Sequence, residues 1–100
     1  MFLCNPPFAT MTDINETLAE RGQRYGRFTT HAELSQTLKQ VIATSMPSGQ
    51  FLAPDQHEAL DMICHKIGRI INGDPNYADS WRDIAGYAML VCNRLEGEDE

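Results

Sequence analysis

The sequence has few basic residues. Its 100 residues include 8 lysines and arginines against 14 aspartates and glutamates, and the formal net charge is −6. A nonspecific nucleic-acid binder needs clustered cations that displace the counterions of the phosphates, so we do not expect that class of function. A small phosphorylated ligand needs only two or three local cations and is compatible with this charge.

Cysteine and long apolar runs are also scarce. The 3 cysteines have no CxxC spacing, so the sequence predicts neither a disulfide framework nor a zinc site. No apolar run approaches the roughly 20 residues of a membrane span. The first ten residues have no basic start of the kind found in signal peptides. We therefore expect a cytoplasmic protein with reduced thiols.

Motifs of nucleophilic catalysis are missing as well. The sequence contains no GxSxG, no glycine-rich phosphate loop and no HxxxH pair. A lone histidine on a helix is more often a surface or cap group than a ligand, and this applies to His57 and His65.

Four segments instead show apolar residues at helical spacing. We expect helices at about 13–24, from Thr29 or Thr30 to Met46, from Pro54 to the turn at 72–77, and from that turn to about Leu95. Thr30 and Glu33 have the spacing of a capping box. The sequence thus predicts an all-α domain of about four helices in a compact bundle.

The predicted organisation is an extended leader at 1–11, a single helical domain at 12–96 and an acidic tail at 97–100. Met11 could itself be the natural start. A chain of this size buries roughly two thirds of its unfolded surface, and some apolar residues lie off the main helical stripes. We therefore expect a homodimer or higher oligomer to complete the bundle.

Each of the last two helices has an apolar stripe and a polar face. The predicted apolar stripes are Leu60, Ile63, Ile67, Ile70 and Ile71 on one helix and Trp81, Ile84, Ala88, Val91 and Leu95 on the other, with Trp81 in the core. The polar face of the first carries Glu58, Asp61, His65 and Arg69, and that of the second carries Asp79, Asp83, Tyr87 and Arg94.

The spaced acids on these two helices suggest a metal site. Magnesium takes oxygen ligands and usually binds through one or two carboxylates plus substrate phosphate. The predicted metal ligands are Glu58, Asp61, Asp79 and Asp83. The alternative is an ordinary solvent-exposed surface, since the acids lie almost opposite the apolar stripe.

Positive charge gathers in the segment RGQRYGRFTTH, residues 21–31. One interpretation is a helix connection whose aromatic residues plug the end of the bundle. The other is an anion-binding or base-stacking loop whose arginines contact phosphate. The candidate ligand-binding residues are Arg24, Tyr25, Arg27, His65, Lys66, Arg69, Asn72 and Tyr87.

Two stretches carry a resemblance to known proteins: the segment EALDMICHKIGRIINGDPNYADSWRDIAGYAMLV and the segment RGQRYGRF. They resemble a family of small phage and prophage proteins of unassigned function, related in pattern to the nucleotide-modification-associated domain. The likeness covers about Leu18 to Leu95. It implies a family and a phage context, and it says nothing about a reaction.

A looser resemblance is to the all-α MazG-like nucleoside triphosphate pyrophosphatases, whose helices carry ExxE and ExxD magnesium motifs. Residues 58–61 look like the first motif, with Asp61 in place of the final Glu. The second motif falls on residues 80–83, where Ser80 replaces the expected Glu and Asp79 lies one position early.

The resulting hypothesis is a phage-encoded nucleotide-handling protein. The first function is magnesium-dependent pyrophosphohydrolysis of a nucleoside triphosphate, in which the metal activates water and neutralises the phosphates. The alternatives are a noncatalytic oligomer that sequesters a nucleotide, such as a host immune signal, and a helical module that binds other proteins.

Overall fold

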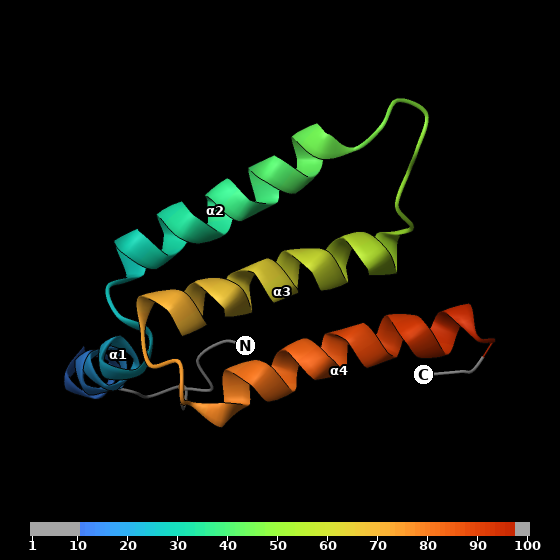
Figure 1. Cartoon of the computed structure of the whole chain (residues 1–100). Helices are drawn as coiled ribbons and strands as arrows, with labels where there is room; N and C mark the ends of the chain where they lie inside the picture. The colour runs from blue at the N-terminus through green and yellow to red at the C-terminus, as the bar shows by residue number, and fades with distance from the viewer. Residues whose placement is uncertain (1–10, 98–100) are drawn as a thin grey trace.

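The computed structural model describes residues 11–97, and this part of the chain contains four helices. They are α1 (Met11–Tyr25), α2 (Phe28–Ser45), α3 (Pro54–Asn72) and α4 (Ala78–Leu95) (Figure 1). The predicted all-α fold of about four helices is therefore confirmed. Most of the predicted leader and acidic tail lies outside the described residues. No helix in 11–97 is both long enough and apolar enough to cross a membrane.

Local sequence explains where two of the helices start and stop. The α2 helix ends two residues before Pro47, because proline disfavours a helical conformation in the residue before it. The α3 helix begins at Pro54, a position where the missing N–H is not needed, and the Gln56 side chain accepts a hydrogen bond of 2.8 Å from the Ala53 N–H.

The predicted capping box of α2 is wrong. The helix starts at Phe28 with Arg27 at the cap position, and no side chain caps it. Thr30 therefore lies within the first helical turn, where its hydroxyl is not placed to cap.

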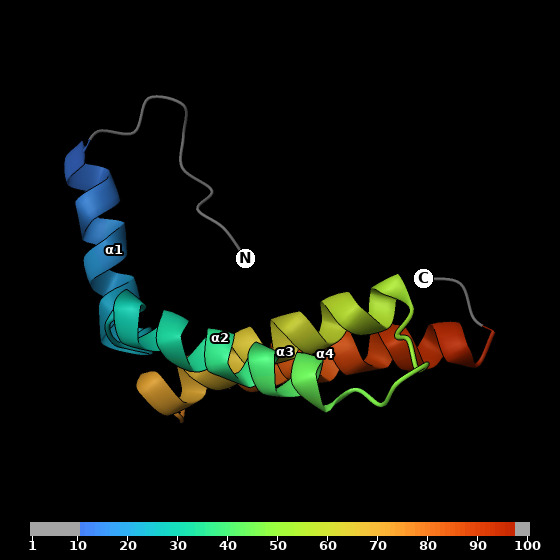
Figure 2. The same cartoon turned by 90° about the horizontal axis from the view of Figure 1, so that it is seen from above.

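The helices α2, α3 and α4 form one layer, and α1 crosses one end of that layer. In Figure 1 the three helices lie one above another with α3 in the middle, and in Figure 2 they fall within a narrow band from which α1 stands away. Within the described residues α3 packs against all three other helices, whereas α2 and α4 do not contact each other. All contacts between helices of this layer therefore involve α3.

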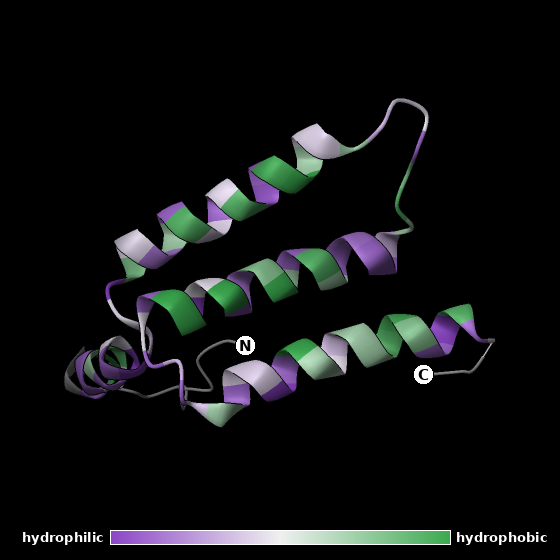
Figure 3. Ribbon diagram, viewed as in Figure 1, coloured by the Kyte–Doolittle hydropathy of each residue, from purple (hydrophilic) through white to green (hydrophobic). Residues whose placement is uncertain are grey.

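Burial follows the same arrangement. The buried apolar side chains of the described region are Ala59, Cys64 and Ile70, all on α3. Polar and apolar stretches alternate along each helix (Figure 3), yet several polar side chains are also buried, namely His31, Ser35, Lys66, Arg69 and Ser80. The interior of this small layer is thus unusually polar.

The predicted polar face of α3 is wrong in part. Arg69 of that face is only 8% exposed, whereas Ile71 of the predicted apolar stripe is 70% exposed; Lys66, which was not assigned to either face, is only 1% exposed. The reason is the central position of α3, which has helices on two sides. Its long cationic side chains bury their aliphatic stems between those neighbours.

The predicted core position of Trp81 is also wrong. Its side chain is 55% exposed, and its Nε1–H donates a hydrogen bond of 2.8 Å to the Pro75 carbonyl in the α3–α4 turn. Ser80, one residue earlier, is buried against α3 instead. Because α4 packs on a single neighbour, its buried face is narrow and is rotated from the predicted stripe.

Candidate functional site

Two turns dock against each other at the end of the layer where α1 crosses. The Asn72 Nδ2 group, at the end of α3, donates hydrogen bonds to the carbonyls of Tyr25 at 2.8 Å and Arg27 at 2.9 Å. The Asp74 N–H donates to the Arg24 carbonyl at 2.6 Å. These bonds hold the α1–α2 junction onto the α3–α4 turn. We call this contact the turn clamp.

Two glycines allow the backbones to come this close. Gly26 has a φ of 78°, in the left-handed region, and a Cβ at this position would lie 2.2 Å from the Asn72 carbonyl oxygen. A Cβ at Gly73 would lie 2.1 Å from the Arg24 carbonyl oxygen. Both obstacles are backbone atoms, so a side chain at either position forces the turns apart.

The turn clamp brings cations and tyrosine rings together. The guanidinium of Arg69 lies 4.1 Å from the centre of the Tyr25 ring, and that of Arg24 lies 4.9 Å from the centre of the Tyr77 ring. The two tyrosines meet edge to face at 6.1 Å. Stacking on an aromatic face holds a guanidinium in place and leaves its N–H groups free to bind an anion.

These side chains surround a hollow of about 390 Å³, which we call the arginine hollow. Its lining residues are Arg21, Arg24, Tyr25, Arg69, Tyr77, Asp79, Ser80 and Asp83. Asp79 pairs with Arg82 at 2.5 Å, and Asp83 pairs with Lys66 at 3.0 Å. Both carboxylates of the hollow are thus already engaged by cations.

Arg69 is the least balanced charge of the arginine hollow. Among the residues that the structure describes, no carboxylate lies within ion-pair distance of its guanidinium. Burial lowers the pKa of Arg69, and the nearby charge of Arg21 also lowers it, while Tyr25 and the more distant carboxylate of Asp83 act in the opposite direction. A guanidinium nevertheless stays protonated in proteins. A bound anion would therefore supply the negative charge that this buried cation lacks.

The four predicted metal ligands do not converge within one chain. Asp55 is bound by Arg94, and Lys66 is bound by Asp83, so these pairs fix the register of α3 against α4. In this register Asp61 lies opposite Ala88, which is about 7.5 Å of helix rise from Asp83. No group of three or more histidine, cysteine, aspartate or glutamate side chains within 11–97 could hold a metal ion.

The two pairs of acids have different surroundings. Glu58 is exposed. Asp61 lies on the side of α3 that faces α2, with a carboxylate oxygen 3.2 Å from His57 Nδ1. Only Asp79 and Asp83 line the arginine hollow. The residues of a single chain therefore do not fit the predicted four-carboxylate magnesium site, and magnesium binding stays a prediction.

The predicted ligand-binding residues are placed more closely together. Arg24, Tyr25 and Arg69 line the arginine hollow, while Arg27 and His65 line a second hollow beside it. Lys66 pairs with Asp83 and lines neither hollow. Asn72 is occupied by the turn clamp, which gives it a structural role. Tyr87 lines a shallow groove along α4, outside both hollows.

Three further residues line the arginine hollow: Tyr77 and Ser80, which the sequence did not predict, and Arg21, which belongs to the segment 21–31 but was not among the candidate ligand-binding residues. Arg21 and Arg24 are three residues apart, and this spacing places them on one face of a helix. That signal was available in the sequence. Tyr77 and Ser80 enter the hollow only because the α3–α4 turn docks on the end of α1, which no local pattern predicts.

The second hollow has a volume of about 490 Å³, and we call it the histidine hollow. Arg21, Tyr25 and Arg69 line both hollows and form the wall between them. On its far side, His31 Nε2 lies 3.3 Å from His65 Nδ1, and the two rings meet edge to face at 4.5 Å. His31 is only 4% exposed. The histidine pair thus links α2 to α3.

Burial keeps this histidine pair neutral. It lowers the pKa of His65 from 6.5 to about 4, with the charge of Arg69 adding to the effect, and it also lowers the pKa of His31. A neutral imidazole has one N–H donor and one acceptor nitrogen. The two imidazoles therefore offer hydrogen-bonding groups without adding to the charge of Arg21, Arg27 and Arg69, which line the same hollow.

The histidine pair predicts a loss of stability in mild acid. The pKa values are lower in the folded chain than in the unfolded chain, so the unfolded chain binds protons first as the pH falls below about 6.5. The stabilisation is complete above that pH and declines toward pH 4. After allowance for solvent screening, we expect the free energy of unfolding to fall by roughly 1–2 kcal/mol between pH 7 and pH 5.

Urea unfolding at the two pH values measures this difference. The His65→Gln variant should reduce the pH dependence, whereas the matched His57→Gln variant, at an exposed position, should keep it. Equal pH dependence in all three proteins would contradict the role assigned to the pair.

Comparison with known proteins adds one finding. Residues 10–94 match a protein family described as a domain of unknown function (DUF6378). No curated protein and no solved structure matches the chain.

Proposed function

For a chain that belongs to the DUF6378 family, a domain of unknown function, we propose a function from its own site: it binds a phosphorylated small molecule of the nucleotide class in the arginine hollow. The observation that carries the proposal is Arg69, which is 8% exposed and has no carboxylate partner in the described region. A phosphate group accepts paired hydrogen bonds from a guanidinium, and it balances the charge.

The composition of the arginine hollow supports a small anion. Arg69 has no carboxylate partner in the described region, and both carboxylates of the hollow already pair with other cations, Lys66 and Arg82. The volume of about 390 Å³ is within the usual range for small-molecule sites. The net charge of −6 makes a nucleic acid a poor alternative, because its many phosphates would be repelled.

The resemblance to nucleotide-handling families supports the choice of a nucleotide among small phosphorylated molecules. Binding without hydrolysis agrees best with the site, because Lys66 and Arg69 occupy α3 opposite Asp83 and Ser80 on α4. A magnesium site shared by the two helices would need carboxylates where these cations are. Sequestration of a nucleotide, such as a host immune signal during phage infection, is a role of this kind.

Magnesium-dependent pyrophosphohydrolysis is the second candidate. One observation favours it, namely that Asp79 and Asp83 line the same hollow as the arginines. A magnesium ion that arrives with a polyphosphate often needs only one or two protein carboxylates. This function agrees with the looser MazG-like resemblance.

The Arg24→Gln variant tests the site. Arg24 lies on a tyrosine ring and pairs on the surface with Glu20, so its replacement should leave folding nearly unchanged. Loss of charge-assisted hydrogen bonds should weaken nucleotide binding by about 1.5–3 kcal/mol, or roughly 10- to 150-fold. Calorimetric titration with a panel of nucleoside mono-, di- and triphosphates gives the affinity.

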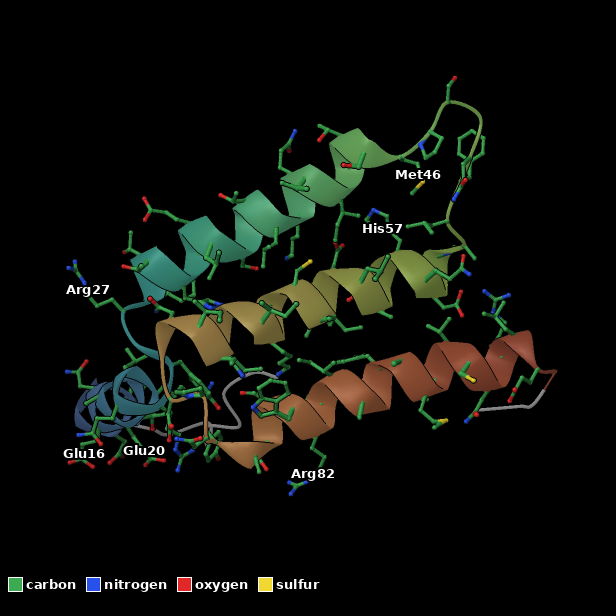
Figure 4. All side chains as sticks on the ribbon, in the orientation of Figure 1. Glu16, Glu20, Arg27, Met46, His57 and Arg82 are labelled. Atoms are coloured by element: carbon green, nitrogen blue, oxygen red, sulfur yellow. The ribbon has the colours of Figure 1, made fainter. Side chains whose placement is uncertain are left out.

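Lys39→Gln is the control, because Lys39 lies on α2 and lines neither hollow. Arg82 is not a suitable control: its side chain is 72% exposed and points away from α3 (Figure 4), but it pairs with Asp79 of the arginine hollow. Equal losses in both variants would show that only the overall charge matters, and would reject the site. Chromatography of the recovered ligand distinguishes sequestration from hydrolysis. Intact ligand supports sequestration. Products that form only with magnesium, and that the Asp79→Asn variant does not form, support hydrolysis.

A further inference from the structure

The histidine hollow lies directly beside the arginine hollow, yet it differs from it in chemistry. The wall of Arg21, Tyr25 and Arg69 belongs to both. Beyond this wall the histidine hollow contains the aromatic rings of Phe28, His31 and His65 together with Arg27, whereas the arginine hollow contains Asp79 and Asp83. A ligand held by the arginines can therefore extend into a space of about 490 Å³ without leaving the protein surface.

The rings in the histidine hollow suit a flat partner. Phe28 and His31 lie 6.2 Å apart with a tilt of 44°, and His31 meets His65 edge to face. Phe28 is 77% exposed, and Leu18 at the rim is 52% exposed. A planar heteroaromatic ring can stack on such side chains, and in doing so it covers apolar surface that otherwise faces water.

Hydrogen bonding in the histidine hollow also fits such a ring. His65 uses Nδ1 in its contact with His31, and no described residue makes a hydrogen bond to its Nε2. A neutral imidazole nitrogen can donate to or accept from the polar edge of a nucleobase. The side of the hollow that His31 and His65 form is therefore suited to a ring with polar atoms at its edge.

We propose that the bound molecule is a nucleoside phosphate that spans the wall between the hollows, with its base in the histidine hollow and its phosphates in the arginine hollow. This inference rests on the proposed function, because the arginines fix the phosphate end. It adds that the base contributes to the affinity and that the histidine hollow selects among bases.

Gly22 offers a direct test. It lines the histidine hollow but not the arginine hollow, and a Cβ added there meets no atom within 4 Å. Gly22 lies within α1, where leucine and alanine both form helix better than glycine does. Gly22→Leu should therefore obstruct the hollow without unfolding the chain, and Gly22→Ala is the matched control.

Two kinds of probe test the two ends of the ligand separately. Nucleoside triphosphates with four different bases have both ends, whereas inorganic tripolyphosphate has no base. Calorimetry of the wild type should show tighter binding of at least one nucleotide than of tripolyphosphate. Gly22→Leu should weaken nucleotide binding by about tenfold or more and change tripolyphosphate binding by less than about twofold. A loss of about 1.4 kcal/mol corresponds to that tenfold change.

Phe28→Ala is a second variant with the same expected pattern, because the exposed ring contributes little to the fold. Arg24→Gln should weaken the binding of both probes. Equal binding of nucleotides and tripolyphosphate by the wild type, or equal losses for both probes in Gly22→Leu, would overturn the base site alone. Failure of both probes to bind the wild type would overturn the proposed function as well.

Discussion

The Asp83→Asn variant is expected to lose about 2–4 kcal/mol of folding free energy. Asp83 holds the ammonium group of Lys66 at 3.0 Å, and the Lys66 side chain is only 2% exposed. Without the carboxylate, a buried charge remains with a neutral amide as its partner. The estimate lies below the usual cost of breaking a fully buried pair because Asp83 itself is 45% exposed.

Thermal and urea unfolding measure this loss, and Asp79→Asn is the matched control. Asp79 is 54% exposed and its partner Arg82 is 72% exposed, so this change should cost less than about 0.5 kcal/mol. Replacing Lys66 with Met in the Asp83→Asn background should restore most of the stability, because the unpaired charge is gone. Wild-type stability of Asp83→Asn would mean that water reaches Lys66 freely.

A second large effect is expected at the turn clamp. Gly26→Ala and Gly73→Ala should each destabilise the protein by roughly 3 kcal/mol or more, because the added Cβ meets a backbone carbonyl that cannot rotate away. The close distances are 2.2 Å at Gly26 and 2.1 Å at Gly73. The turns must separate to accommodate either side chain, so the hydrogen bonds of Asn72 should break as well.

Gly22→Ala provides the contrast, since it adds the same methyl group to a helix with open space around it. It should raise stability by up to about 1 kcal/mol. Urea midpoints for the three variants compare the sites directly. If all three shifted the midpoint alike, the clamp would not be a close backbone contact in solution. Gly26→Ala and Gly73→Ala should also lose anion binding, because the arginine hollow forms only when the turns dock.

The helices could be predicted from the sequence because their signals are local. Apolar spacing, Pro47 and Pro54 mark where α2 ends and α3 begins. The faces of the helices could not be predicted in the same way. A periodic pattern identifies two sides of a helix, but it does not reveal that α3 has neighbours on both sides, or that Lys66 and Arg69 are therefore buried.

The candidate site was predictable to a similar degree. The cluster of arginines around Tyr25 is visible in the sequence, and it contributes Arg24 and Tyr25 to the arginine hollow. The predicted four-carboxylate metal site is not formed by one chain, because the spacing of acids along a helix does not give the register between helices. That register places Asp61 well away from Asp83 and pairs Asp83 with Lys66. Tertiary contacts thus decide which charges meet.

The single layer of α2, α3 and α4 has a consequence for motion. Since α2 and α4 both contact α3 and do not contact each other in the described region, either outer helix can detach while the other stays in place. Amide hydrogens in the middle of α3 should then exchange slowest with solvent, and those of α2 and α4 should exchange through separate local openings. A ligand at the turn clamp would slow exchange chiefly at the end of the layer where α1, α2 and α3 meet.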